Sequence, residues 1–265
     1  MVLFGREMTM DTKDSLIIDA ALLAGSLVLE NGGETFRAEE TTVNFCLACG
    51  CESASAIAFA TGVIITVTRN SDTHSALRRV TKRGTDLVRL SGVNDITRKF
   101  IRGDITFEQA YEGLKALSKK KGPHKILQLL ASAVAASLFA LLFGGGAFDA
   151  AVAFLAGFAV KGISFSFKYT SIYNFAISFI GGCVIAIVAT LSVSLFKMGN
   201  IAHIITGATM PLLPGLMLTG AIRDTVMGDL MAGTTRIVES LLVAIAIASG
   251  VGIVLSAYVS LGGVV

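Results

Sequence analysis

The stretch IAHIITGATMPLLPGLMLTGAIRDTVMGDLMAGTTR, residues 201–236, decides how the chain is interpreted. Its first part is apolar enough to enter a membrane, yet Pro211 and Pro214 stand near its middle, with Gly215 and Gly220 beside them. Each proline removes a backbone donor and clashes with the preceding turn, so the sequence predicts a broken helix. Secondary transporters place such breaks where half-helix ends meet the charged groups of the substrate. A kink that only shapes packing is the alternative.

Charged residues follow the proline pair directly, and they favour transport over a packing kink. The predicted substrate path comprises Thr209, Met210, Pro211, Pro214, Gly215, Arg223, Asp224, Asp229, Arg236 and Glu239, together with Lys161 in an earlier apolar run. Arg223 or Lys161 would supply the positive charge for a substrate carboxylate, although Lys161 could equally snorkel towards the membrane surface. Asp224 and Asp229 would pair with the arginines Arg223 and Arg236, and one carboxylate would carry a coupling proton.

The charged residues are unevenly divided along the 265-residue chain. Residues 1–121 hold 16 of the 22 Lys and Arg residues and 15 of the 19 Asp and Glu residues. The first part therefore has the composition of a soluble domain, and residues 122–265 have that of a membrane domain. The net charge of +3 gives no reason to expect nucleic-acid binding. The polar start of the chain has no signal-peptide core, so we expect residues 1–121 to stay in the cytosol.

Residues 1–121 are expected to form an α+β domain, with helices flanking a short antiparallel sheet. Helical spacing of apolar residues predicts helices over 14–30, 34–49, 91–101 and 106–118. Two β-branched runs joined near Ala60 to Gly62 predict a pair of strands, and 75–83 a third. Thr106 and Gln109 have the spacing of a capping box.

A polar motif, ENGGETFRAEET, joins the first two predicted helices. Its candidate residues are Glu30, Gly33, Glu34, Thr35, Arg37, Glu39 and Thr41. Glu34, Arg37 and Thr41 share one helical face, which allows a salt bridge or a polar site, while a solvated helix start is the alternative. A membrane-tethered, hydrolase-like enzyme that uses Glu34, Arg37 and Glu39 is the second functional hypothesis, and a sensor or scaffold the third.

The cysteines Cys46, Cys49 and Cys51 have no second pair of ligands, which a zinc site would need. We interpret them as small core residues in a reducing compartment. No metal, cofactor or catalytic set is predicted.

Five apolar runs are long enough to cross a bilayer, which takes about 20 residues per helix. The predicted spans are residues 126–143, 147–167, 172–196, 201–221 and 237–260. Basic residues at 119–121 and Lys125 precede the first span, which places the N-terminus in the cytosol and the C-terminus outside. The predicted fold class is a polytopic α-helical membrane protein with five transmembrane helices and an N-terminal α+β cytosolic domain.

An odd number of spans has a consequence for assembly, because many secondary transporters pair repeats of opposite orientation. Five spans correspond to one half of such a pair, so a separate subunit or a second copy of the chain would complete it. Small residues such as Gly157, Gly182 and Gly250 would let the helices approach closely. His203 in the fourth span is either a packed neutral histidine or a proton carrier.

With these motifs in place, the chain resembles the threonine/serine exporter family from about residue 15 to residue 258. The stretches that carry the resemblance are AGSLVLENGGETFRAEETT (24–42) and GATMPLLPGLMLTGAIRDTVMGDLMAGTTRIVES (207–240). The second is the more specific, since its proline pair, Arg223-Asp224, Gly228-Asp229 and Arg236-x-x-Glu239 fall as in the family. In the first, Ala38 stands where valine is common.

The chain differs from the long, fused members of that family because it ends after five predicted spans. It resembles the shorter type, whose membrane half is completed by a separate small membrane protein, and a pair of that kind is implicated in succinate export from enteric bacteria. The resemblance implies a subunit of an inner-membrane exporter, not an enzyme, with threonine/serine or a dicarboxylate such as succinate as its substrate. The expected partners are the lipid bilayer, the small subunit or a second copy of the chain, and a small carboxylate.

Overall fold

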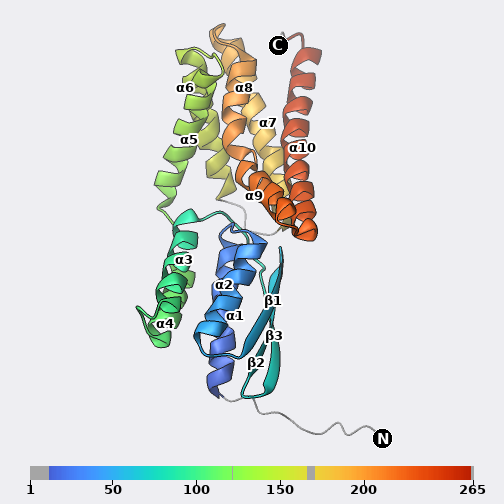
Figure 1. Cartoon of the computed structure of the whole chain (residues 1–265). Coiled ribbons are helices and arrows are strands. Elements are labelled where there is room, and N and C mark those ends of the chain that lie inside the picture. Colours follow the sequence, from blue (N-terminus) through green and yellow to red (C-terminus); the bar gives the residue numbers. More distant parts are fainter. Residues whose placement is uncertain (1–11, 121, 166–170, 264–265) are drawn as a thin grey trace, which may run out of the picture. The chain divides into compact units, whose positions relative to one another are not determined.

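A computed structural model describes residues 12–120, 122–165 and 171–263. The chain divides into two compact units, and Figure 1 labels their elements. The N-terminal unit consists of Met1–Lys121 together with Thr219–Arg236, and the transmembrane unit consists of Gly122–Leu218 together with Ile237–Val265. Residues 219–236, which we had grouped with the membrane part of the sequence, thus pack within the N-terminal unit.

The N-terminal unit is a three-stranded antiparallel sheet with helices. In chain order its first elements are α1 (Thr12–Glu30), α2 (Thr35–Ala48), β1 (Ser53–Phe59), β2 (Gly62–Arg69), β3 (Asp72–Arg79), α3 (Leu87–Ile101) and α4 (Phe107–Lys119). The strand order is β1-β2-β3, and the register pairs Ile64 with Ile57 on one side and with Leu77 on the other. The α+β prediction and the capping box of Thr106 with Gln109 are confirmed.

The predicted bounds of the third strand, which begins at Asp72 and not at residue 75, and of the third helix are wrong. The third strand ends at Arg79 and not at residue 83, because its partner strand begins at Gly62, which is paired with Arg79. Helix α3 begins at Leu87 and not at residue 91, because the Asp86 side chain accepts the N–H of Arg89 at 3.0 Å and caps the helix.

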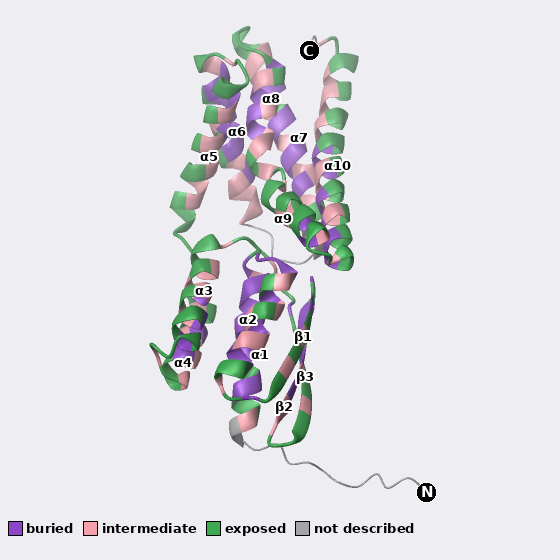
Figure 2. Ribbon diagram, viewed as in Figure 1, coloured by how far each residue is buried: buried purple, intermediate pink, exposed green. Residues whose placement is uncertain are grey.

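The core of the N-terminal unit lies between α1, α2, α3 and the inner face of the sheet. Figure 2 colours most of α1 as buried, and Val63 and Ile65 of β2 lie in the same core. Cys46 and Cys51 are buried there, and burial raises the pKa of both thiols, in agreement with a role as small core residues. Gly25 lets α1 and α2 approach closely, since a Cβ there would lie 2.0 Å from Thr42 Oγ1.

The transmembrane unit is built from apolar helices that run side by side in Figure 1. The remaining elements of the chain are α5 (Lys125–Leu142), α6 (Ala147–Ser164), α7 (Ser171–Phe196), α8 (Ile201–Thr209), η1 (Met210–Leu212), α9 (Gly215–Val226) and α10 (Leu230–Ser260). Among the described residues, four helices are long and apolar enough to cross a membrane. The count reaches five if residues 201–212 and α9, which are bent relative to each other, form one span. The predicted end of the second span at residue 167 lies outside the described residues.

The predicted break in the fourth span is confirmed. Residues 201–212 and α9 are bent by 54° at the connection through Leu213 and Pro214.

The fifth span, in contrast, was predicted to begin at residue 237, and the helix begins at Leu230. Gly228, with φ +95°, reverses the chain, and Asp229 accepts the N–H of Ala232 at 3.0 Å, so the new helix starts at once.

Small residues set the spacing of the transmembrane helices, as predicted. A Cβ on Gly182 would lie 2.4 Å from the carbonyl oxygen of Ile247, and one on Gly250 would lie 2.2 Å from that of Phe179, so α7 and α10 pack backbone against backbone. A Cβ on Gly207 of α8 would lie 2.5 Å from the backbone nitrogen of Ala140 on α5. Helices in lipid have no hydrophobic driving force to associate, so van der Waals packing at such close contacts is a main source of helix association.

Candidate functional site

The site begins with the turn that joins α1 to α2. Gly32 has a φ of +88°, and the N–H of Gly33 donates to the carbonyl of Val28 at 2.8 Å. A Cβ on Gly33 would lie 2.4 Å from Val28 Cγ1, so only glycine fits without a shift. Glu34 then precedes α2 as its N-terminal cap residue in extended conformation, but its side chain makes no capping hydrogen bond.

Asp224 of α9 supplies the negative charge at the start of α2. Its Oδ1 accepts two hydrogen bonds from Thr35, one from the backbone N–H at 3.1 Å and one from Oγ1 at 3.1 Å. Asp224 is fully buried, and so is Thr35. A carboxylate is favoured there because the first N–H groups of a helix lack partners within the helix and carry partial positive charge.

Arg236 of α10 completes the buried part of the site. Its Nη1 lies 3.0 Å from Asp224 Oδ2, and its Nη2 donates to the carbonyl of Gly33 at 2.9 Å. Arg236 is 8% exposed. The helices α9 and α10 lie close together beside this pair, since a Cβ on Gly233 would lie 2.1 Å from Thr225 Oγ1. One buried ion pair therefore links the start of α2 to both helices.

A second, more exposed ion pair lies on the same turn. Arg223 Nη1 contacts Glu34 Oε1, and Arg37 Nε lies 3.5 Å from Glu34 Oε2. The Glu34 side chain is 10% exposed, whereas the side chains of Arg223 and Arg37 are 59% and 45% exposed. We call Gly33, Glu34, Thr35, Arg37, Arg223, Asp224 and Arg236 the polar cluster. Its guanidinium groups outnumber its carboxylates, so the cluster itself carries one formal positive charge.

Asp224 and Asp229 were expected to pair with Arg223 and Arg236, and the two aspartates have different partners in the structure. Asp224 pairs with Arg236. Asp229 instead caps α10, and Arg223 pairs with Glu34, a residue that the sequence analysis treated separately. The three donor groups around Asp224 suit an ionised carboxylate, which only accepts hydrogen bonds.

The remaining predicted residues lie outside the polar cluster. Glu39 Oε1 accepts the N–H of Ala58 at 2.8 Å and joins α2 to β1, whereas Glu34 and Arg37, the other residues of the enzyme hypothesis, pair with each other. Burial raises the pKa of Glu30 above its ordinary value of 4.5. Thr41 lies on α2, half-buried.

In the transmembrane unit, Lys161 Nζ lies 5.5 Å from the centroid of the Phe165 ring. Thr209 Oγ1 donates to the carbonyl of Thr206 on its own helix at 3.0 Å. Met210 and Pro211 form η1, and Pro214 and Gly215 follow at the bend, whereas Glu239 is half-buried on α10.

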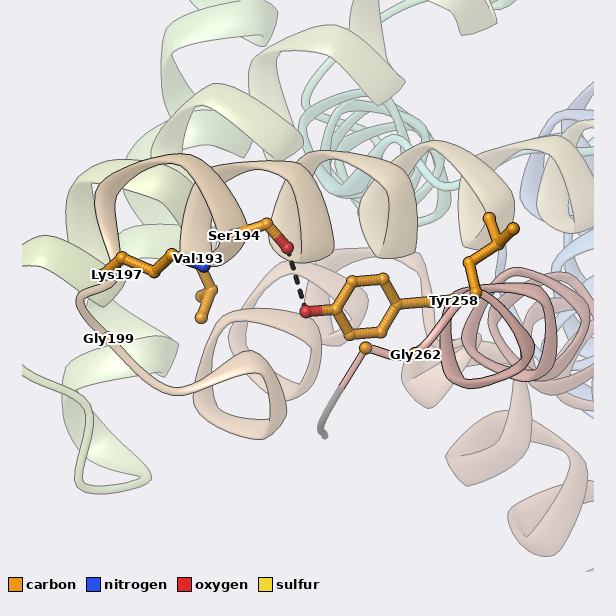
Figure 3. A pocket seen from close by; sticks show the side chains of 8 residues that line it. Val193, Ser194, Lys197, Gly199, Tyr258 and Gly262 are labelled. Atoms are coloured by element: carbon orange, nitrogen blue, oxygen red, sulfur yellow. Dashed lines mark hydrogen bonds between the residues drawn. The ribbon is translucent and has the colours of Figure 1, made fainter.

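A cavity in the transmembrane unit was not predicted from the sequence. It has a volume of about 540 Å³ and lies between the end of α7, the segment before α8 and the end of α10. Figure 3 shows the hydroxyl groups of Ser194 and Tyr258 pointing toward each other across it, 2.9 Å apart. Lys197 and Gly199 also line it.

The apolar helices and the broken span are those of a multi-pass membrane protein. The chain matches the model of the family described as "Putative threonine/serine exporter" over residues 19–258, and it belongs to that family. This confirms the resemblance noted from the sequence. The two stretches that carried the resemblance are the ones that meet in the polar cluster.

One similar relative is a protein of Mycobacterium tuberculosis named "Probable threonine/serine exporter". It is 23% identical over 253 residues, which cover 94% of this chain and 46% of the relative. The chain thus spans about half the length of the curated relative that it matches. No solved structure matches the chain.

Proposed function

We propose that the chain is a subunit of an inner-membrane secondary exporter of small carboxylates, namely threonine and serine or a dicarboxylate such as succinate. Its family membership supports a transporter rather than an enzyme. Basic residues before α5 favour a cytosolic N-terminal unit, with the C-terminus outside.

The observation that carries the proposal is the arrangement of Glu34 between Arg223 and Arg37. A nearly buried carboxylate is held by two guanidinium groups that remain about half exposed. Guanidinium groups bind carboxylates through paired, charge-assisted hydrogen bonds. A substrate carboxylate from the cytosol would replace Glu34 at Arg223, and Glu34 would hold the arginine in position while the site is empty.

The bend after η1 supports a path for the substrate through the membrane. Gly215 opens α9 at the bend, and a Cβ added to it would meet no atom within 4 Å. The first N–H groups of a half-helix are donors for an anion, and transporters use such ends near the bilayer midplane. Thr209, Met210, Pro211, Pro214 and Gly215 would frame this path, with Lys161 as a second positive charge.

A partner is part of the proposal. The chain spans about half of the curated relative, and the helices able to cross a membrane give four or five spans among the described residues. A separate small membrane subunit would pair with this chain, because many secondary transporters combine two repeats of opposite orientation. A second copy of the chain is the alternative assembly.

The test is efflux from cells loaded with labelled threonine or, separately, labelled succinate. The cells express the full chain with and without the candidate small subunit. Efflux of either substrate only with both proteins supports the two-part exporter and identifies its substrate. Efflux with the chain alone supports the homo-oligomer, and no efflux of either substrate in any combination contradicts the proposal.

Arg223→Ala tests the residue role within the same assay. We expect export to be lost while the amount of folded protein in the membrane is unchanged, and Arg223→Lys to restore it only in part because a lysine lacks the planar fork. Arg102→Ala, an exposed arginine at the end of α3, is the matched control. Full export by Arg223→Ala would remove this arginine from the substrate path.

A further inference from the structure

The transmembrane unit contains one carboxylate that the proposed function does not use. Asp149 lies in the first turn of α6 and is 4% exposed. Its Oδ2 accepts the N–H of Gly146 at 2.9 Å, and its Oδ1 accepts the N–H of Asn200 at 2.8 Å. A buried carboxylate thus joins the start of α6 to the segment just before α8.

His203 of α8 faces this carboxylate. Its Nδ1 lies 3.7 Å from Asp149 Oδ2, which is within ion-pair range for a protonated imidazole but too long for a hydrogen bond. Asn200 caps α8 by accepting the N–H groups of Ala202 at 2.8 Å and of His203 at 3.4 Å. The His203 side chain is 35% exposed and that of Asp149 is 5% exposed, so an accessible imidazole stands beside an inaccessible carboxylate.

Close backbone packing holds the two side chains at this separation. Gly199 has a φ of +87°, and a Cβ there would lie 2.5 Å from Asp149 Oδ1. A Cβ on Gly145 would lie 3.2 Å from the Cβ of His203. Glycine at both positions leaves the room that the pair occupies.

The cavity of Figure 3 borders the backbone segment that packs against the pair. Gly199 lines that cavity and also packs against Asp149, so a single backbone segment lies between the cavity and the carboxylate. Lys197 and the hydroxyl group of Tyr258 line the same cavity.

The charges near His203 come from few residues. Of the elements packed against α8, α6 brings Asp149 and, near its other end, Lys161. Helix α5 brings Lys125 at its first residue, and α7 brings Cys183 and is followed by Lys197. Asp149 is the one carboxylate in the sequences of these helices.

We propose that Asp149 and His203 form the proton-binding site through which the transmembrane unit couples export to proton entry. With a neutral imidazole the pair carries one negative charge, and a proton bound at Nδ1 makes it neutral overall. The proton reaches the imidazole from the side on which His203 is exposed and is later released to the cytosol, which restores the neutral imidazole. Acid–imidazole pairs within membrane segments serve as proton relays in pumps and transporters. The proposal rests on the proposed function as an exporter.

Two measurements in proteoliposomes separate this proposal from the exporter proposal. The vesicles hold the full chain, with its small subunit if export requires one. Exchange of labelled for unlabelled substrate at equal pH needs only a substrate path, whereas efflux that is accelerated by acid outside needs the proton site. We expect His203→Gln to keep exchange and lose the acceleration. His124→Gln, outside the pair at the start of α5, should behave like the natural chain.

Either of two results would overturn the proton site. His203→Gln could retain the full acceleration, or it could lose exchange as well, which would make His203 part of the substrate path. Absence of exchange by the natural chain would instead count against the exporter proposal.

Histidine NMR then tests the site without transport. The chain has 3 histidines, so substitution assigns each signal of the full chain in nanodiscs. Asp149→Asn should shift the signals of the His203 imidazole, which faces that carboxylate at 3.7 Å, and leave those of His74 and His124 unchanged. Signals of His203 that are unaffected by Asp149→Asn contradict the proposal.

Discussion

Two ion pairs on the same turn of the N-terminal unit differ in their access to water. Asp224 and Arg236 are buried, and each makes a further hydrogen bond to the backbone at the start of α2. Glu34 and Arg223 lie beside them, but the Arg223 side chain is 59% exposed. Removing one partner of the buried pair leaves the other as an unpaired buried charge, whereas Glu34 has Arg37 as a second partner if Arg223 leaves it. The first pair can therefore fix structure, while the second can exchange its partner for a ligand.

The largest effect is expected from Asp224→Ala. The change leaves Arg236 as a buried charge without its carboxylate and removes the acceptor for Thr35, so the free energy of unfolding should fall by about 3–5 kcal/mol. Thermal unfolding of the detergent-solubilised full chain measures this. The double variant Asp224→Leu with Arg236→Met removes both charges and should recover part of the loss. An unfolding temperature of the single variant close to that of the natural chain would show that the pair does not hold the fold.

A smaller effect is expected from Thr35→Val, which has nearly the same shape. It removes the Oγ1 hydrogen bond to Asp224 and keeps the backbone N–H bond. The loss in the free energy of unfolding should be about 1–3 kcal/mol, the cost of leaving a buried acceptor short of one donor. Thr41→Val, a half-buried threonine on the same helix, is the control and should change the unfolding temperature less.

Arg223→Ala should change stability little, by about 0–1 kcal/mol, because Arg37 still lies 3.5 Å from the Glu34 carboxylate after the exposed arginine is removed. The same variant is expected to abolish export. Arg223→Ala should therefore lose function with little loss of stability, whereas Asp224→Ala should lose stability. A loss of stability as large as that of Asp224→Ala would instead assign the exposed pair a structural role.

The smallest effect concerns Glu30, whose carboxyl pKa is raised by burial above its ordinary value of 4.5. The folded state then binds this proton more tightly than the unfolded chain, so the contribution of Glu30 to stability falls as pH rises above 4.5. Glu30→Gln should raise the unfolding temperature slightly at neutral pH, and the gain should vanish in acid. Unfolding temperatures measured across this pH range test the prediction, with the exposed Glu40→Gln as control. A decrease in the unfolding temperature of Glu30→Gln at neutral pH would contradict it.

Local patterns in the sequence were sufficient for most of the secondary structure. The break at the prolines, the capping box at Thr106 and the strand pair around Ala60 depend on residues close together in the chain. Such features are predictable because each has a nearby physical cause.

The meeting of Glu34 with Arg223 could not be predicted in this way, because 189 residues separate them. The signal was present, since each of the two stretches combined charged residues of both signs, but charge alone does not select a partner. Asp149 was missed for a different reason. It follows a run of glycines and caps α6, and capping explains an aspartate fully until the position of His203 is known.

Helix α10 has 31 residues and a length of about 46 Å. A bilayer core about 30 Å thick needs only about 20 of these residues. The same unbroken helix carries Arg236 in the N-terminal unit and Gly250 in the transmembrane unit. The helix is therefore longer than the bilayer core requires by about 11 residues, or about 16 Å, and these residues continue it into the segment that holds Arg236.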